Sequence, residues 1–296
     1  MNKTKIEWAD ATWNPVTGCL HGCEYCYARR IAERFKGCDK GSTYGAYHQA
    51  TWRCVNPGCE PGKALFEIDK KCPPINIRFD PAAQKERHTR APYPWGFQPT
   101  LHRERLDEPQ HWKKPRTIFV CSMADLFGEW VPDWWIRDVM DAARKAPQHR
   151  YLFLTKNYMR ACDFRYEDNW WLGRTYTHTE NALAAGASQN RNDYLCNGVA
   201  RSAAPYPVWS THKNTFLSVE PISGPVDDLG YYAHDNGYKW VIVGAETGNR
   251  SGKIIPEKEW IDRIVKDCDL RGVPVFMKDS LIQIVGEENM RREFPW

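Results

Sequence analysis

The sequence lacks several features that would assign a chain to a class at once. It has no apolar run that reaches the ~18 residues of a membrane-spanning helix. Residues 1–10 are polar and charged and lack the apolar core of a signal peptide. The chain also has no internal repeat and no low-complexity tract. We therefore expect a cytoplasmic protein that does not act at a membrane.

The composition is that of a folded protein with an unusual amount of cysteine. Of 296 residues, 42% are hydrophobic and 26% are charged, which excludes a disordered chain. At ~150 residues per domain, the length allows one or two domains. In a reducing compartment, the 11 cysteines are expected to bind metal or carry chemistry rather than form disulfides.

The excess of positive charge is small and falls in one segment. Residues 78–116 hold nine basic and five acidic side chains, an excess that equals the formal net charge of +4. The same segment holds Tyr93, Trp95, Phe97 and Trp112. Basic and aromatic side chains together suit phosphate contact and base stacking, which favours a DNA, RNA or nucleotide substrate. The alternative is a solvated, proline-broken loop.

Short apolar runs alternate with helical patterns along much of the chain. The runs are typical of buried strands and span residues 117–121, 151–154, 170–172, 215–219, 240–243 and 273–277. The helical patterns span residues 27–35, 132–146 and 256–270. This alternation predicts an α/β fold with a parallel sheet, closed into a full or partial (β/α) TIM-like barrel. In such a barrel, functional groups lie at the carboxyl ends of the strands.

Each helical pattern spaces its apolar residues for one face. In the first, Ile31 and Phe35 stand four apart. The other two faces comprise Ile136, Val139, Met140 and Ala143, and Trp260, Ile261, Ile264, Val265 and Cys268.

Two stretches do not follow the alternation. Residues 38–116 are proline-rich and poor in periodic apolar residues, and residues 190–214 are also irregular. We therefore expect a single barrel domain over residues 1–296 with two insertions, of which 38–116 contains several cysteines.

Three cysteines near the N-terminus form the strongest chemical signal. Cys19, Cys23 and Cys26 have the spacing Cys-x3-Cys-x2-Cys. Eight residues with three thiols can wrap one metal centre, but a structural zinc site or an ordinary iron–sulfur cluster takes four ligands. A 4Fe–4S cluster held by three thiolates would leave one iron open to a substrate or cofactor. The alternative is zinc with a fourth ligand such as His21.

This spacing, with Tyr25 just before the third cysteine, resembles the signature of the radical S-adenosylmethionine (radical SAM) superfamily. The resemblance implies that Cys19, Cys23 and Cys26 are catalytic and bind a 4Fe–4S cluster, and that Tyr25 packs near the adenine. The open iron would chelate S-adenosylmethionine, whose reductive cleavage yields a 5′-deoxyadenosyl radical that abstracts hydrogen from the substrate. It also implies a full or partial (β/α) barrel and an electron donor such as flavodoxin or ferredoxin.

Members of that superfamily bind the cofactor with residues from strand ends. By position, Ser122 and Asp125 are candidates for the ammonium group, and Lys156 and Lys278 for a carboxylate or phosphate. The ribose candidates are Glu180, Asn181 and Glu220, and the last strand-end candidates are Gly244, which permits close backbone approach, and Glu246. The alternative for each charged group is a surface ion pair or a helix cap. Ser-Met-Ala-Asp stands at 122–125 in place of the superfamily's usual Gly-Gly-Glu.

A narrower resemblance covers most of the chain. It is to an uncharacterised three-cysteine family associated with phages and prophages. The similar segments are residues 6–19, 111–120, 122–127, 146–149, 154–156, 216–221 and 240–246.

A second group of cysteines falls in the first insertion. Cys38, Cys54, Cys59 and Cys72 could close a zinc site or an auxiliary iron–sulfur cluster, with Cys54 and Cys59 around a Pro-Gly turn. The alternative is four unpaired cysteines. The remaining cysteines are expected to be isolated, with Cys121 and Cys268 in the core and Cys162 and Cys196 elsewhere.

Three functions remain open from the sequence. The first is a radical SAM enzyme that modifies or repairs a nucleic-acid or nucleotide-derived substrate. The second is a radical SAM enzyme that acts on a protein or small metabolite. The third is a non-enzymatic nucleic-acid-binding protein in which zinc stabilises the fold.

Overall fold

A computed structural model of the chain describes residues 4–36, 66–68, 76–80, 85–89, 92–93, 95–177 and 213–296. The chain divides into two compact units. The first comprises residues 1–2, 12–115 and 119–148, and the second comprises residues 3–11, 116–118 and 149–296. The prediction of a single domain stays a prediction.

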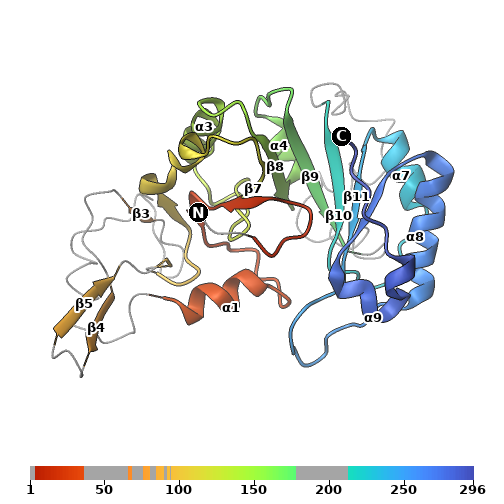
Figure 1. The fold of residues 1–296 in the computed structure, drawn as a ribbon, viewed down its shortest axis with the longest axis horizontal. Helices are drawn as coiled ribbons and strands as arrows, with labels where there is room; N and C mark the ends of the chain where they lie inside the picture. Colours follow the sequence, from red (N-terminus) through yellow and green to blue (C-terminus); the bar gives the residue numbers. More distant parts are fainter. Residues whose placement is uncertain are drawn as a thin grey trace. The chain divides into compact units, whose positions relative to one another are not determined.

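The main sheet has seven parallel strands that follow one another in chain order (Figure 1). Its strands are β1 (Ala11–Trp13), β7 (Thr117–Val120), β8 (Arg150–Thr155), β9 (Trp170–Tyr176), β10 (Thr215–Val219), β11 (Val241–Val243) and β12 (Val275–Met277). Apart from β1, each begins within a few residues of an apolar run in the sequence. The predicted α/β fold with a parallel sheet is confirmed, and the sheet is compatible with a partial barrel.

The second unit holds the continuous ladder from β8 to β12. Leu217 pairs with Val241, which pairs with Val275, so the strands are aligned without a register shift. On one sheet face, the rings of Trp8, Phe216 and Trp240 lie 5.7–6.3 Å apart. Aromatic packing therefore covers that face near the amino ends of β10 and β11, and other residues lie at the carboxyl ends of these strands. The short helices of this unit are α4 (Tyr158–Cys162), α7 (Leu229–Asp235), α9 (Ile282–Val285), η4 (Asp279–Leu281) and η5 (Glu287–Asn289).

Two of the predicted helices pack as the sequence indicates. They are α3 (Asp133–Arg144) and α8 (Lys258–Arg271). The expected face of α3 is buried. Helix α8 buries Ile261, Ile264 and Cys268 of its expected face, while Trp260 and Val265 are only partly buried. In Figure 1, α7 and α8 lie side by side, and the backbone N–H of Gly230 donates to Asp267 Oδ2 at 2.5 Å between them.

The third predicted helix forms with a different orientation. Helix α1 (Tyr27–Arg34) has the expected bounds, but Ile31 and Phe35 are exposed. Ala28 and Ala32 are its buried residues instead. The spacing of Ile31 and Phe35 thus identified the helix without identifying the face that packs.

The first insertion contains regular structure that the sequence analysis did not predict. Within residues 38–116, β3 (Phe66–Ile68) and β6 (Thr100–His102) join β2 (Val16–Thr17) in a small sheet. A separate antiparallel pair is formed by β4 (Asn76–Asp80) and β5 (Lys85–Thr89). Two short 3₁₀ helices, η1 (Arg103–Arg105) and η2 (Glu108–His111), follow β6. The description of this segment as irregular is therefore wrong for these residues. Of the second insertion, only residues 213–214 lie within the described ranges.

Within the described ranges, no helix combines the length and the apolar character needed to cross a membrane.

The pairing of Gly173 with Phe216 across β9 and β10 generates a stability prediction. A Cβ on Gly173 would lie 2.2 Å from Cζ of the Phe216 ring. We expect Gly173→Ala to lower the free energy of unfolding by ~1–3 kcal/mol in chemical denaturation, because the core must shift to admit a methyl group. Adding Phe216→Leu should recover part of this loss. Equal losses for Gly173→Ala in the wild-type and Phe216→Leu backgrounds would contradict the explanation.

Candidate functional site

The cysteine loop is fastened to the rest of the first unit by its backbone. Gly18 has φ of +85°, and a Cβ there would lie 2.2 Å from the carbonyl oxygen of Gln98, so only glycine fits. The N–H of Gly18 donates to the Met123 carbonyl at 2.9 Å, and that of Cys19 donates to the Phe97 carbonyl at 3.2 Å. The loop therefore starts from a fixed position.

The three thiols share one neighbourhood. Cys19 and Cys26 both pack against the apolar cluster of Ala28, Ala32, Phe97 and Met123. The pKa of the Cys19 thiol is raised to about 12, mainly by burial; a hydrogen bond with the His21 backbone lowers it, and the nearby charges of Asp125, Cys23 and Cys26 add to the rise. A positive metal centre would offset both effects, because thiolate is the form that ligates metal.

The third cysteine also begins the helix that follows. Cys26 is the N-cap of α1, and its Sγ accepts the backbone N–H of Arg29 at 3.4 Å. The N-terminus of a helix favours negative charge, so this position suits a thiolate.

A buried carboxylate holds the loop between its first two cysteines. Asp125 Oδ2 bonds His21 Nε2 at 2.8 Å, while its Oδ1 accepts the N–H of Phe127 at 3.1 Å. Asp125 is 6% exposed, so burial without these partners would be costly. The His21 ring also lies edge-on to Trp130, with 4.9 Å between centroids. With Nε2 directed at the carboxylate, Nδ1 is the His21 nitrogen that faces away from this bond.

Ser122 is likewise engaged within the first unit. Its Oγ donates to Asn14 Oδ1 at 3.1 Å, and the N–H of Met123 donates to the same oxygen at 3.0 Å. The Ser122 carbonyl accepts the Tyr27 hydroxyl at 2.8 Å. Ser122 and Asp125, expected from position to meet the ammonium group, thus hold the loop and the start of α1 in place. Asn14, whose side chain links two backbone segments, carries no sequence pattern that would identify it.

In the second unit, the sheet brings three predicted residues into one row. Glu220, Gly244 and Lys278 directly follow β10, β11 and β12. Each stands two residues after a member of the paired row formed by Ser218, Ile242 and Phe276, so the three are aligned across the sheet. Lys278 Nζ and Glu220 Oε1 form an ion pair. A Cβ on Gly244 would lie 3.0 Å from Lys278 Cδ and 3.4 Å from Glu220 Cδ, so the ion pair passes over the glycine.

A buried hydroxyl lies in the row below this ion pair. Ser218 is 1% exposed, and its Oγ has no hydrogen-bond partner among the residues that the structure describes. Strand alternation puts it on the same face as Glu220. Lys156 falls two residues beyond Leu154, which shares a row with Gly173 and Phe216, so its position belongs to this face as well. Ser218 could not be identified from the sequence, because a serine within an apolar strand has no distinctive pattern.

Glu246 lies apart from this row and has its own partner. Both of its carboxylate oxygens accept from Arg250, each at 2.8 Å, and the Glu246 side chain is 5% exposed. This geometry is a bidentate, largely buried ion pair. Neither Glu220 nor Glu246 caps a helix, because the next helices begin at Leu229 and Lys258.

The remaining candidates divide into those that are described and those that are not. Tyr25 and Lys156 are partly buried. Cys121 and Cys268 are confirmed as core residues. The candidates outside the described residues are Cys38, Cys54, Cys59, Cys72, Glu180, Asn181 and Cys196.

Much of the described part of the basic segment serves the fold. Arg103 pairs with Asp138 at 3.1 Å, and Arg105 donates to the backbone carbonyls of Asn14 and Pro92. Two of its aromatic residues are buried, Phe97 at 6% and Trp112 at 8% exposed. Of its basic residues in this described part, Lys113 and Lys114 are exposed.

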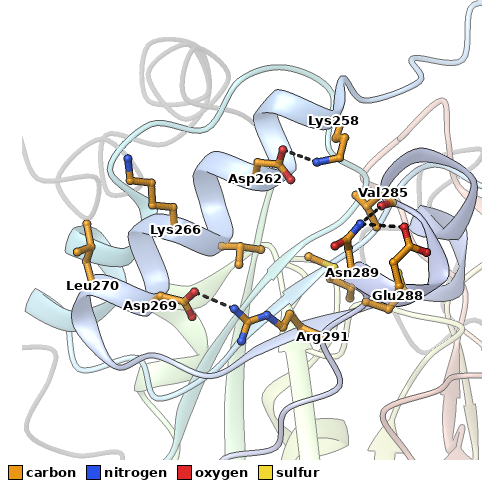
Figure 2. A pocket seen from close by; sticks show the side chains of 12 residues that line it. Lys258, Asp262, Lys266, Asp269, Leu270, Val285, Glu288, Asn289 and Arg291 are labelled. Carbon is orange, nitrogen blue, oxygen red and sulfur yellow. Dashed lines mark hydrogen bonds and ion pairs between the residues drawn. The ribbon is translucent and has the colours of Figure 1, made fainter.

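The second unit also has a groove of about 550 Å³ between α8 and the C-terminal segment (Figure 2). Val265 and Met277 contribute apolar surface to it. Ion pairs along it join Lys258 to Asp262 at 2.5 Å and Asp269 to Arg291 at 2.9 Å. Its lining contains no residue predicted from the strand ends, and its charges of opposite sign are largely paired.

Across the described residues, no group of three or more His, Cys, Asp or Glu side chains is assembled for a single metal ion. The donor set of the cysteine loop nevertheless fits an iron–sulfur cluster. It offers three thiols in eight residues, two of which, Cys19 and Cys26, pack against one apolar patch, with Cys26 at a helix N-terminus. A cluster needs thiolate ligands and a largely apolar environment.

The chain belongs to the family described as "Protein of unknown function (DUF5131)", whose model matches residues 3–57 and 47–283. No curated protein matches the chain. No solved structure matches it either.

The burial of Cys121 and Cys268 predicts their reactivity. Burial raises the pKa of each thiol to about 12, so little thiolate forms at pH 8. In native protein treated with iodoacetamide at pH 8, we expect peptide mass spectrometry to find Cys162 alkylated well before either buried thiol. Because the pKa values are raised, alkylation of the two buried thiols should increase as the pH rises towards 12.

Denatured protein provides the control, because all three thiols should then react at similar rates. Native alkylation of Cys268 as fast as that of Cys162 would show that the predicted burial is wrong.

Proposed function

We propose that the protein is a radical SAM enzyme. The observation that carries this proposal is the loop Cys19–Cys26, which holds three thiols, two of them against one apolar patch, and contains no fourth cysteine. The α/β fold with a parallel sheet supports it, since polar residues follow the strands at one edge. Membership in the DUF5131 family leaves the activity open.

The residues of the first unit have distinct parts in this proposal. Cys19, Cys23 and Cys26 would ligate a 4Fe–4S cluster, which supplies an electron and an open iron for reductive cleavage of S-adenosylmethionine. Asp125 positions His21 and with it the segment between the first two thiols. Asn14 positions the Ser122–Met123 backbone against which the loop is fastened.

In the second unit, the row Glu220, Gly244 and Lys278 would bind the polar groups of a ligand. Glu220 can accept from hydroxyls, and Lys278 can donate to a carboxylate or phosphate. Gly244 leaves its backbone accessible because it has no side chain. Support comes from the ion pair that joins the two charges over this glycine.

For the substrate, we propose a nucleic acid or a nucleotide derivative. The support is the excess of four positive charges in residues 78–116. Because Arg103 and Arg105 are engaged within the fold, the exposed Lys113 and Lys114 are the described residues best placed to contact phosphate. A protein or small-metabolite substrate is the alternative.

The first test of this function is anaerobic reconstitution with iron and sulfide. We expect broad absorption near ~400 nm and, with dithionite, conversion of S-adenosylmethionine to 5′-deoxyadenosine measured by liquid chromatography. Cys19→Ser, Cys23→Ser and Cys26→Ser should each lower both signals to background, because each removes a ligand.

Cys162→Ser is the matched control, since Cys162 lies outside the loop, at the end of α4. It should keep the iron content and the product yield. Bound zinc without 5′-deoxyadenosine formation in the wild-type protein would instead favour a zinc-stabilised binding protein.

The second test concerns the substrate class. Binding of single-stranded RNA or DNA, followed by fluorescence anisotropy, should weaken with salt. The double variant Lys113→Gln/Lys114→Gln should reduce the slope of log affinity against log salt by about 1.4, because two phosphate contacts on a single strand are lost. The control Lys239→Gln/Lys266→Gln removes two exposed lysines of the second unit and should bind like the wild type. Absent or salt-independent binding would favour the alternative substrates.

A further inference from the structure

Helix α1 exposes its largest apolar side chains. Tyr27, Ile31 and Phe35 at its C-cap are 43%, 37% and 46% exposed, whereas Ala28 and Ala32 are buried. A surface helix normally turns its large apolar residues to the core and its small or polar residues outward. An exposed group of large apolar residues indicates a contact surface more often than a single one does.

These residues form one stripe along the helix. At 3.6 residues per turn, positions four apart are offset by only about 40°, so Tyr27, Ile31 and Phe35 lie along one side. The same arithmetic puts Arg30 and Arg34 along one flank of the stripe. We call these five residues the α1 face.

The other side of the helix is occupied within the first unit. Arg29 places its guanidinium 5.2 Å from the Phe97 ring centroid, and Glu33 Oε1 accepts the Phe97 N–H at 3.2 Å. The one acidic residue of the helix is therefore directed away from the α1 face. Along the stripe, the Arg34 guanidinium lies 5.4 Å from the Phe35 ring centroid, so the apolar surface has a positive edge.

The α1 face begins next to the cysteine loop. Tyr27 directly follows Cys26, and the Cys26 Sγ accepts a hydrogen bond from the first turn of the same helix. A protein docked there would lie close to the third thiol. Electron transfer between proteins requires such proximity, because its rate falls steeply with distance.

We propose that the α1 face docks an acidic one-electron carrier protein of the flavodoxin or ferredoxin class. This inference rests on the proposed function. The carrier loses one electron and the cluster gains it, with no bond formed or broken. An apolar centre with a charged edge is the usual composition of a transient protein interface, and the positive edge complements an acidic partner. The aliphatic Ile31 in the centre and only two flanking arginines favour a protein over a nucleic acid.

The test uses the full reconstituted protein with reduced flavodoxin and an acidic [2Fe–2S] ferredoxin as probes. Surface plasmon resonance measures their binding, and stopped-flow absorbance measures cluster reduction. We expect Ile31→Ser/Phe35→Ser to weaken carrier binding by about tenfold, because the centre of the contact is lost. Arg30→Gln/Arg34→Gln should slow association and reduce its dependence on salt. Both variants should slow reduction by the carrier but leave reduction by dithionite and the iron content unchanged.

Ile254→Ser/Ile255→Ser provides the matched control, because it removes two exposed aliphatic residues of the second unit, 41% and 70% exposed. It should bind both carriers like the wild type. Unchanged carrier binding in the two α1 variants would overturn the docking inference, as would a loss confined to RNA or to anionic vesicles. Failure to assemble any cluster in the wild type would instead overturn the proposed function, and the docking inference with it.

Discussion

Parallel pairing from β8 to β12 is the constraint on which the polar edge of the second unit depends. Strands that run in the same direction bring the residues that follow them to one edge. The register that pairs Leu217, Val241 and Val275 also aligns Glu220, Gly244 and Lys278. A slip of one residue in β12 would turn Lys278 to the opposite face and break the ion pair. The apolar pairing inside the sheet, rather than the charges, thus determines where these charges meet.

The parts of the fold that could be predicted from the sequence are those with strong local patterns. Runs such as Thr117–Cys121 and Trp240–Val243 are short, apolar and bounded by polar residues, and each contains a strand of the sheet. The face of α3 was also correct, because four apolar residues at helical spacing leave one orientation that buries them. By contrast, β5 has the sequence Lys-Glu-Arg-His-Thr, which carries no apolar alternation. Its pairing with β4 depends on backbone hydrogen bonds, which the pattern of its side chains does not predict.

The positions of the candidate site residues could be predicted, but their partners could not. Strand ends can be found locally, so Asp125, Glu220 and Lys278 were recognised as candidates. Their partners depend on contacts between distant segments: His21 and Asp125 are 104 residues apart, and Glu220 and Lys278 are 58 apart. These contacts also change the role expected of Asp125 and Ser122, because both hold the cysteine loop and the start of α1 in place. Supporting contacts of this kind orient ligands in metal sites generally.

Helix α1 shows how packing around the loop affects the surface beside it. The residues of α1 buried against Phe97 and Met123 are the small Ala28 and Ala32, so the backbone of α1 lies close to that cluster. This close approach fixes Cys26 at the N-cap and brings it onto the same apolar patch as Cys19. The larger side chains must then point elsewhere, and leaving a large apolar side chain exposed forgoes up to ~1.5–3 kcal/mol of burial. The Tyr27 hydroxyl donates to the Ser122 carbonyl, which gives Tyr27 a role in the fold, whereas the exposed Ile31 and Phe35 gain little burial there. The docking partner proposed above would cover these side chains, and the arginines on their flank favour an acidic one.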